Sequence, residues 1–254
     1  MTLRHPAKIA KYWVHKWYYY IKALGPIRGT VWFYKLRIAT RRLPATFRIG
    51  TILLRNTTAD IGVFEKFYIY PLFDEIVAGL PENTSLLDLG GNIGLSTRRF
   101  LELCPNGNAC VVEPAKINHE LLKVNLSNFP KATIIVGAVG SYSGTGVIKN
   151  PTDRHDSFTV AVAADNQEGD DVFAIYDLNT LISQTACTFL KCDIEGGEFD
   201  IFRPANPPHL EKVKVAVVEV HSIPGEKESD IFDMFERLGF RYSVKGEDCV
   251  FTRS

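Results

Sequence analysis

The chain has 254 residues, of which 46% are hydrophobic, and its 29 Lys and Arg balance its 29 Asp and Glu. This length and hydrophobic content suit one domain with a sizeable core and an appendage. No run approaches 18 uninterrupted apolar residues, so we expect no transmembrane helix. The N-terminus lacks the features of a secretory signal and the five cysteines form no C-x-x-C pair, so we expect a cytoplasmic protein with reduced thiols.

Charge is distributed unevenly along the chain. Residues 1–59 carry 12 Lys and Arg and no acid, whereas residues 60–254 carry all 29 acids. Such an asymmetry indicates a basic face with an anionic partner. Residues 1–45 hold all three Trp and differ in composition from the rest. We therefore expect a basic, aromatic, helical segment at 1–45 and a main domain at 46–254.

Residues 6–24 are predicted to form an amphipathic helix. One face carries Ile9, Trp13, Trp17, Tyr20, Ile21 and Leu24, and the opposite face carries Lys8, Lys11, His15 and Lys22. A basic helix with Trp on its apolar side suits contact with a membrane surface or with an anionic, lipid-linked molecule, as a peripheral membrane protein makes. The alternative is that the apolar face packs on the main domain or on a second copy.

The following segments alternate between strand and helix. An extended pair is predicted at 46–55, a helix near 62–79 and a turn at 81–83. Further strands are predicted at 85–89, 109–113, 133–139, 187–193 and 213–220, and helices at 94–103, 115–127, 177–183, 197–202 and 228–238. Short strands and loops are expected within 146–178, with an acidic patch at 165–171, and a hairpin at 240–253. This order predicts an α/β fold with a doubly wound, mostly parallel, Rossmann-like sheet.

Residues 86–94, LLDLGGNIG, predict a strand–turn–helix that binds a nucleotide-like cofactor. Asp88 would repel a pyrophosphate, but it suits the ammonium and sulfonium of S-adenosylmethionine. The dinucleotide pattern G-x-G-x-x-G fails from Gly90, because Asn and Leu occupy the next two glycine positions. We assign Asp88, Gly90, Asn92 and Gly94 to the cofactor site. The alternative for Asp88 is a helix cap, for which Asn92 is better placed.

Two further residues are assigned to the cofactor. Glu113 ends the next strand about 20 residues after the glycines, where an acid can hydrogen-bond ribose hydroxyls. The alternative is a surface glutamate before Pro114. Ala138, in the strand predicted at 133–139, is assigned to the same site.

Polar residues also follow the strands at 187–193 and 213–220. Asp193 and Glu195, at i and i+2 of an extended stretch, would point to one side and face the ligand crevice. Carboxylates placed in this way bind a hydroxyl, accept its proton or hold a divalent cation. The alternative is acids that favour a helix N-terminus, which suits Glu198. His221 is a candidate general base, with a structural histidine as the alternative.

Together these segments resemble the FkbM-type S-adenosylmethionine-dependent methyltransferase family. The resemblance covers about residues 50–222 and runs through 87–94, 112–114, 190–198 and 218–221. The run Asp-x-Glu-Gly-x-Glu is its most specific element, whereas Gly91 and Gly197 stand where the family usually has Ala. The resemblance implies a seven-strand class I methyltransferase fold, S-adenosylmethionine as cofactor and O-methylation of a hydroxyl, often on a sugar or polyketide-type product.

On this basis we expect a small-molecule or glycan acceptor, such as a sugar, a glycolipid or a secondary metabolite, and no nucleic-acid partner. Asp193, Glu195 and His221 are the candidates for removing the proton and positioning the hydroxyl. Two alternatives stay open: an NAD(P)-binding Rossmann oxidoreductase, and a non-catalytic peripheral membrane protein that kept the fold.

Overall fold

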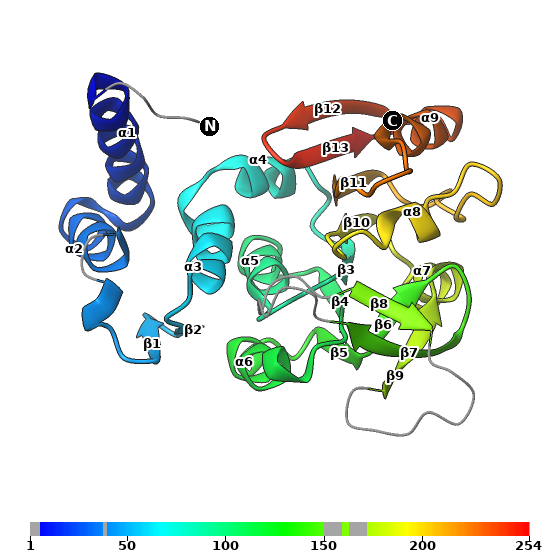
Figure 1. Cartoon of the computed structure of the whole chain (residues 1–254), viewed down its shortest axis with the longest axis horizontal. Coiled ribbons are helices and arrows are strands. Elements are labelled where there is room, and N and C mark those ends of the chain that lie inside the picture. The colour runs from blue at the N-terminus through cyan, green and yellow to red at the C-terminus, as the bar shows by residue number, and fades with distance from the viewer. Residues whose placement is uncertain (1–5, 38–39, 150–158, 163–171, 254) are drawn as a thin grey trace. The chain divides into compact units, whose positions relative to one another are not determined.

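The computed structural model describes residues 6–37, 40–149, 159–162 and 172–253 (Figure 1). The chain divides into two compact units, Met1–Gly79 and Leu80–Ser254. The boundary that we expected after residue 45 falls inside the first unit. Among the described residues, no helix combines the length and the hydrophobicity needed to cross a membrane.

The N-terminal unit is built from helices and one hairpin. Its elements are α1 (Pro6–Leu24), α2 (Pro26–Arg37), the 3-10 turn η1 (Thr40–Arg42), β1 (Thr46–Ile49), β2 (Ile52–Arg55), α3 (Thr58–Phe64), the π-helical turn η2 (Glu65–Ile69) and α4 (Leu72–Ala78). The expected helix at 6–24 and extended pair at 46–55 are confirmed. The single helix expected near 62–79 is wrong. Thr57 caps an earlier start, and Pro71 separates η2 from α4 because it holds Tyr70 in an extended conformation.

Buried Glu65 ties the N-terminal helices to η2. Its carboxylate accepts a hydrogen bond from the Tyr20 hydroxyl and forms ion pairs with Lys16 of α1 and Arg37 of α2. A buried carboxylate is costly unless it is paired, so these partners fix α1 and α2 around one residue. Burial raises the pKa of Tyr20 to about 12, which keeps its hydroxyl a proton donor.

The second unit contains a seven-strand sheet in the order β12-β13-β11-β10-β3-β4-β5. Its strands are β3 (Ser85–Leu89), β4 (Asn108–Glu113), β5 (Ala132–Val136), β10 (Phe189–Cys192), β11 (Val215–Glu219), β12 (Arg241–Lys245) and β13 (Asp248–Thr252). The flanking helices are α5 (Leu95–Leu103), α6 (Lys116–Leu126), α7 (Leu178–Thr185), α8 (Glu198–Ile201) and α9 (Glu228–Arg237). Strand β13 runs antiparallel to β11 and β12, whereas the central strands are parallel. The predicted doubly wound, mostly parallel sheet is confirmed.

The core of the unit is built around the central strands β3, β10 and β11. Every residue of β3 is buried, as expected for a parallel strand whose sheet is covered on both faces. The order of the strands along the chain reverses between β3 and β10, which pair with Leu89 opposite Cys192. Such a reversal leaves a ligand crevice outside the carboxyl ends of the two strands.

A second, four-stranded sheet is formed by the part of the chain between β5 and β10. Its strands are β6 (Ala138–Gly140), β7 (Gly144–Lys149), β8 (Thr159–Val162) and β9 (Val172–Asp177), in the order β6-β9-β7-β8. The single strand expected at 133–139 is wrong because Gly137, with φ +157°, divides it between the two sheets. A Cβ atom at Gly137 would lie 2.5 Å from the carbonyl oxygen of Ala174. The acidic patch expected at 165–171 lies outside the described residues.

Candidate functional site

The turn between β3 and α5 requires glycine. Gly90 and Gly94 have φ of +76° and +83°, and Asn92 also has a positive φ, of +49°. A Cβ atom at Gly90 would lie 1.8 Å from the carbonyl oxygen of Asp193, which follows the neighbouring strand β10. The absence of a side chain at Gly90 therefore lets the glycine turn approach the loop after β10.

Asn92 presents a buried acceptor at this turn. Its backbone N–H donates to Glu113 Oε2 at 2.8 Å. Its Oδ1 has no hydrogen-bond partner within the part of the chain that the structure describes. The alternative that Asp88 caps α5 is wrong, and Asn92 does not cap it either, since Gly94 occupies the N-cap and no side chain caps the helix. A buried acceptor without a partner is costly, so this oxygen is available for a ligand donor.

Asp88 is fully buried beneath the turn. Its Oδ2 accepts hydrogen bonds from the hydroxyls of Ser96 and Thr97 in α5. Its Oδ1 lies 3.2 Å from Nζ of Lys191, which also donates to the carbonyl oxygen of Gly90 at 2.8 Å. The carboxylate of Asp88 is thus engaged within the protein, where it holds the end of β3 to α5 and to Lys191.

Lys191 connects the glycine turn to the loop after β10. Its Nζ, which contacts Asp88 and the carbonyl oxygen of Gly90, also lies 3.9 Å from Asp193 Oδ2. The sequence analysis did not single it out. The available signal was a lysine inside an otherwise apolar strand, since a buried lysine requires charged or polar partners.

Glu113 links the turn to α6 and is buried, so the alternative of a surface glutamate is wrong. Its carboxylate accepts hydrogen bonds from Asn92 N, Ala115 N and Asn118 Nδ2. Burial raises the pKa of this carboxyl, whereas these hydrogen bonds lower it. Ala138 is also buried, and Gly137 before it donates to the carbonyl oxygen of Glu113 at 3.2 Å. Ala138 therefore comes next to the end of β4.

Asp193, Glu195 and His221 come together at the ends of adjacent strands β10 and β11. Nε2 of His221 lies 3.9 Å from Asp193 Oδ1 and 3.4 Å from Glu195 Oε2. The extended stretch expected at 193–195 is wrong, because Glu195 and Gly196 have φ of +57° and +98° and form a turn. The side chains converge because parallel strands end at the same edge of the sheet.

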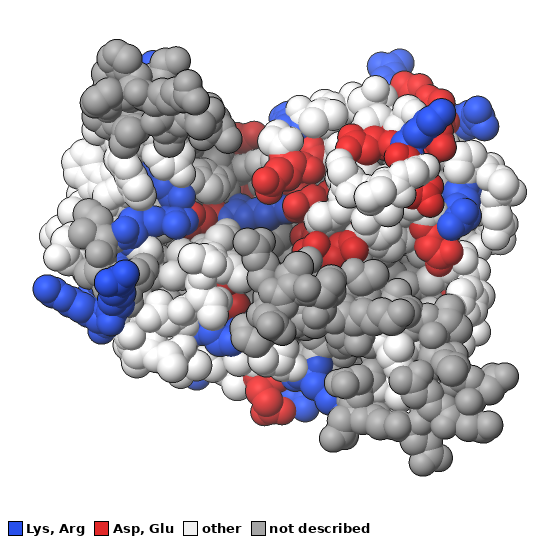
Figure 2. All heavy atoms as spheres, in the orientation of Figure 1, with Lys and Arg blue, Asp and Glu red and all other residues white. Residues whose placement is uncertain are grey.

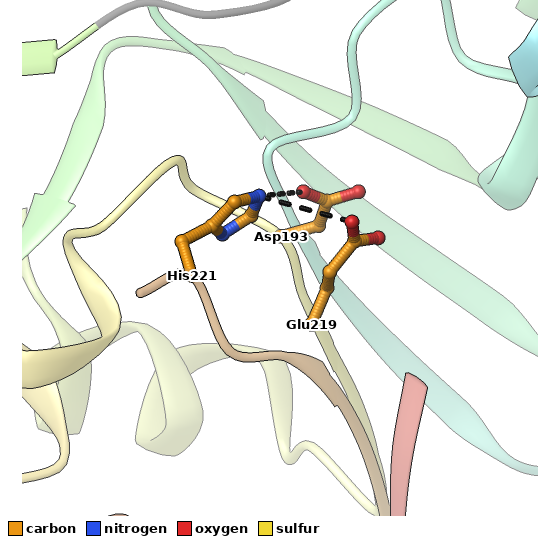
Figure 3. A group of neighbouring side chains, drawn as sticks. All are labelled: Asp193, Glu219 and His221. Carbon is orange, nitrogen blue, oxygen red and sulfur yellow. Dashed lines mark ion pairs between the residues drawn. The ribbon is translucent and has the colours of Figure 1, made fainter. Parts of the chain in front are cut away.

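Two more carboxylates belong to this cluster. Glu219 Oε1 lies 3.8 Å from His221 Nε2, and Figure 3 shows Asp193 and Glu219 facing the same imidazole nitrogen. Glu219 precedes His221 by two residues, a spacing that places both on one side of a strand. Glu198 is fully buried, and its Oε1 lies 3.1 Å from His221 Nδ1. The sequence analysis treated Glu198 only as an acid at a helix start.

Glu198 fixes the loop as well as the imidazole. Its Oε1 accepts from Ile194 N at 3.0 Å and its Oε2 from Gly196 N at 2.8 Å. A carboxylate near a helix start that reaches back to preceding N–H groups resembles the arrangement of a capping box, which was the available sequence signal.

The cluster is partly open and strongly charged. The side chains of Asp193, Glu195, Glu219 and His221 are 20–30% exposed. The hydrogen bond to Glu198, followed by the nearby carboxylates, raises the pKa of His221 to about 9. Burial raises the pKa of Glu195 to about 7, while His221 opposes this rise. At neutral pH these values favour an imidazolium, and they make Glu195 the better proton acceptor of the two.

Comparisons with known proteins found one matching family model, one curated relative and several similar structures. The model of the Methyltransferase FkbM domain matches residues 88–242. AMB antimetabolite synthetase AmbE of Pseudomonas aeruginosa is 20% identical, over 80% of this chain and 11% of its own length. Methyltransferase FkbM from Methylobacillus flagellatus KT has a similar structure, with 15% identity and a TM-score of 0.44 over 76% of this chain and 53% of that one. Precorrin-6y C5,15-methyltransferase from Geobacter metallireducens GS-15 has 12% identity and a TM-score of 0.43 over 72% of this chain and 88% of that one. This chain thus spans about a tenth of AmbE and about half of the first structure.

Proposed function

Because the chain belongs to the FkbM methyltransferase family, we propose that it transfers a methyl group from S-adenosylmethionine to a hydroxyl oxygen. The acceptor is a small molecule or glycan, such as a sugar, a glycolipid or a secondary metabolite. The observation that carries the proposal is the close approach of the glycine turn at Gly90 to Asp193, which belongs to the acidic cluster. It supports a cofactor site and a proton-accepting site that share one crevice.

The residues of the turn fit this cofactor. The buried Asn92 Oδ1 offers an acceptor without a protein partner, and Glu113 is anchored beside it by the Asn92 N–H. Gly90 and Gly94 have the positive φ values that the turn requires. Asp88 accepts hydrogen bonds from Ser96 and Thr97, which holds α5 against the end of β3 and stabilises the turn between them. When bound, S-adenosylmethionine would supply a methyl group attached to a sulfonium. The sulfur is a good leaving group because it departs as a neutral thioether.

The work left to the chain is alignment and proton removal. A hydroxyl oxygen must lie in line behind the methyl group, at near-attack distance. We assign proton acceptance to Glu195 and orientation of the hydroxyl to Asp193. We assign to His221 the positioning of these carboxylates, because Nε2 contacts both and Nδ1 is held by buried Glu198.

The proposal is tested by binding and by product chemistry. Calorimetry of the full chain should give saturable binding of S-adenosylhomocysteine and none of NAD, and the reverse result would favour the oxidoreductase. Methyl-labelled cofactor is then supplied with hydroxylated acceptors, and the product is treated first with alkali and then with hydriodic acid. An O-methyl ether resists the alkali and releases volatile methyl iodide with the acid. A label recovered only as alkali-labile ester or as N-methyl product would contradict O-methylation of a hydroxyl.

The assigned base gives a second test. Glu195→Gln should lower turnover by about 10²–10⁴-fold and leave the affinity for S-adenosylhomocysteine within a few-fold of that of the wild type. Glu211→Gln, an exposed acid before β11, is the matched control and should change neither value. Equal turnover in the wild type and Glu195→Gln would remove Glu195 from the mechanism.

The N-terminal unit supports a second element of the proposal, contact with an anionic membrane surface. Trp13 and Trp17 of α1 are 39% and 38% exposed, although Tyr20 on the same predicted apolar face is fully buried. On α2, exposed Ile27, Val31 and Tyr34 follow one another at helical spacing, and exposed Lys11, Lys22, Arg28 and Lys35 lie along the two helices. On the face shown in Figure 2, the charged residues coloured on the left of the view are mainly Lys and Arg. Exposed aromatic residues together with basic ones suit the headgroup region of a bilayer.

A further inference from the structure

Three side chains of the acidic cluster have the arrangement of metal ligands. One donor atom each from Asp193, Glu219 and His221 lies within 4.8 Å of the other two. A divalent ion that binds at about 2.0–2.5 Å keeps its ligand atoms roughly 3–4.5 Å apart. In Figure 3 both carboxylates face the same imidazole nitrogen, Nε2. We propose that Asp193, Glu219 and His221 form a divalent-cation site that holds the acceptor hydroxyl, an inference that rests on the proposed methyl transfer.

The orientation of the imidazole is an observation independent of the two carboxylates. Nδ1 of His221 lies 3.1 Å from Glu198, which is not one of the three ligands and is fully buried. The oxygens of Glu198 are themselves held by the N–H groups of Ile194 and Gly196. Histidines that bind metals almost always donate their second ring N–H to a carboxylate or carbonyl in this way. When the imidazole is neutral and Nδ1–H donates to Glu198, the lone pair of Nε2 is directed toward Asp193 and Glu219.

The charge of the surroundings favours a cation. Four carboxylates, of Asp193, Glu195, Glu198 and Glu219, contact one imidazole ring. Lys191 is shared between Asp193 and the buried Asp88. Protonation of His221 compensates one negative charge, whereas a divalent ion compensates two. The mixture of one imidazole with carboxylates suits Mn²⁺ among the first-row ions.

Three protein ligands leave coordination positions open, and the 20–26% exposure of these side chains allows a hydroxyl to reach them. A cation there lowers the pKa of the bound hydroxyl. Glu195, which is outside the three ligands, accepts the proton as the oxygen attacks the methyl carbon. The carbon–sulfur bond breaks, the oxygen–carbon bond forms, and sulfur keeps the electron pair.

The test uses Mn²⁺ and the full chain after exhaustive chelation. Electron paramagnetic resonance measures the free Mn²⁺ that remains during a titration, and we expect one bound ion per chain. Asp193→Asn and Glu219→Gln should each weaken binding by about tenfold or more, and Glu198→Gln should weaken it as well. Asp233→Asn, an exposed acid on α9, is the control and should bind as the wild type does. Circular dichroism establishes that each variant is folded.

No saturable binding up to about 1 mM Mn²⁺ would overturn the site, and so would unchanged binding in both ligand variants. The proposed methyl transfer is judged separately by S-adenosylhomocysteine binding and by product analysis. Full turnover under chelation would therefore reject the cation site and leave the methyl transfer intact. Mn²⁺ binding at these ligands without any O-methyl product would support the cation site and contradict the proposed methyl transfer.

Discussion

Lys191→Met removes the positive charge that lies against the buried carboxylate of Asp88, and its effect follows from two distances. Nζ lies 3.2 Å from Asp88 Oδ1, with side chains that are 5% and 0% exposed, and 2.8 Å from the carbonyl oxygen of Gly90. At an effective dielectric constant of about 20, two charges 3.2 Å apart interact by about 5 kcal/mol. Breaking a buried pair by removing one partner costs about 3–5 kcal/mol. We therefore expect the free energy of unfolding to fall by about 3–5 kcal/mol.

The assay must follow the second unit. All three Trp lie in residues 1–45, so Trp fluorescence follows the N-terminal unit, whereas far-UV circular dichroism during urea unfolding follows the whole chain. For a domain of this size the expected loss corresponds to about 6–20 °C in Tm. The double variant Asp88→Asn/Lys191→Met should be more stable than the sum of the single effects implies, because it leaves no unpaired charge. A loss below about 1 kcal/mol for Lys191→Met, or strict additivity in the double variant, would refute the reasoning.

Two further predictions concern the glycine turn and the N-terminal helices. Gly90→Ala should abolish S-adenosylhomocysteine binding, because a Cβ atom there would lie 1.8 Å from a backbone oxygen. The control Gly246→Ala has a similar φ of +71° but open space around the Cβ position, so it should lower the free energy of unfolding by only about 1 kcal/mol. Equal effects in calorimetry and unfolding would show that strain in φ, not the close approach, dominates at residue 90. Trp13→Ser/Trp17→Ser should reduce co-sedimentation with anionic liposomes, and Tyr242→Ser, an exposed aromatic on β12, should not. Negligible sedimentation of the wild type would reject membrane contact.

Local patterns accounted for most of the element order. Apolar runs bounded by turn residues predicted β3, β4, β10 and β11, because these strands are mostly buried and each is flanked by its own turn. The failures occurred where one residue interrupts a continuous pattern. Gly137 was included in a strand although a single glycine in a strand pattern is a signal for a bend, and Pro71 was included in a helix.

The site was predictable to the extent that strand ends are predictable. Asp88, Asp193 and His221 each follow or end an apolar strand, so topology alone brings them to one edge of the sheet. Glu198 and Lys191 were missed because their importance comes from burial and from pairing with residues distant in the chain, and Glu219 was missed because its proximity to Asp193 depends on the pairing of β10 with β11. A glutamate at a helix start is usually solvated, and only the fold shows that Glu198 is enclosed beneath the imidazole.

The second sheet has a consequence for the position of α8. It departs from the main sheet at β6 and returns at β9, and these two strands are parallel neighbours with Ala138 opposite Ile175. Because the two strands are parallel, Gly140 at the end of β6 lies opposite Asp177 at the end of β9, and the chain between the strands runs back to Val172 at the other end of the pair. Ser141, which follows β6, is hydrogen-bonded to Asp200 of α8, the helix that begins just after the loop carrying Asp193 and Glu195. A change in the segment after β6 can thus act on α8 through Ser141 and Asp200, whereas the glycine turn lies outside this segment.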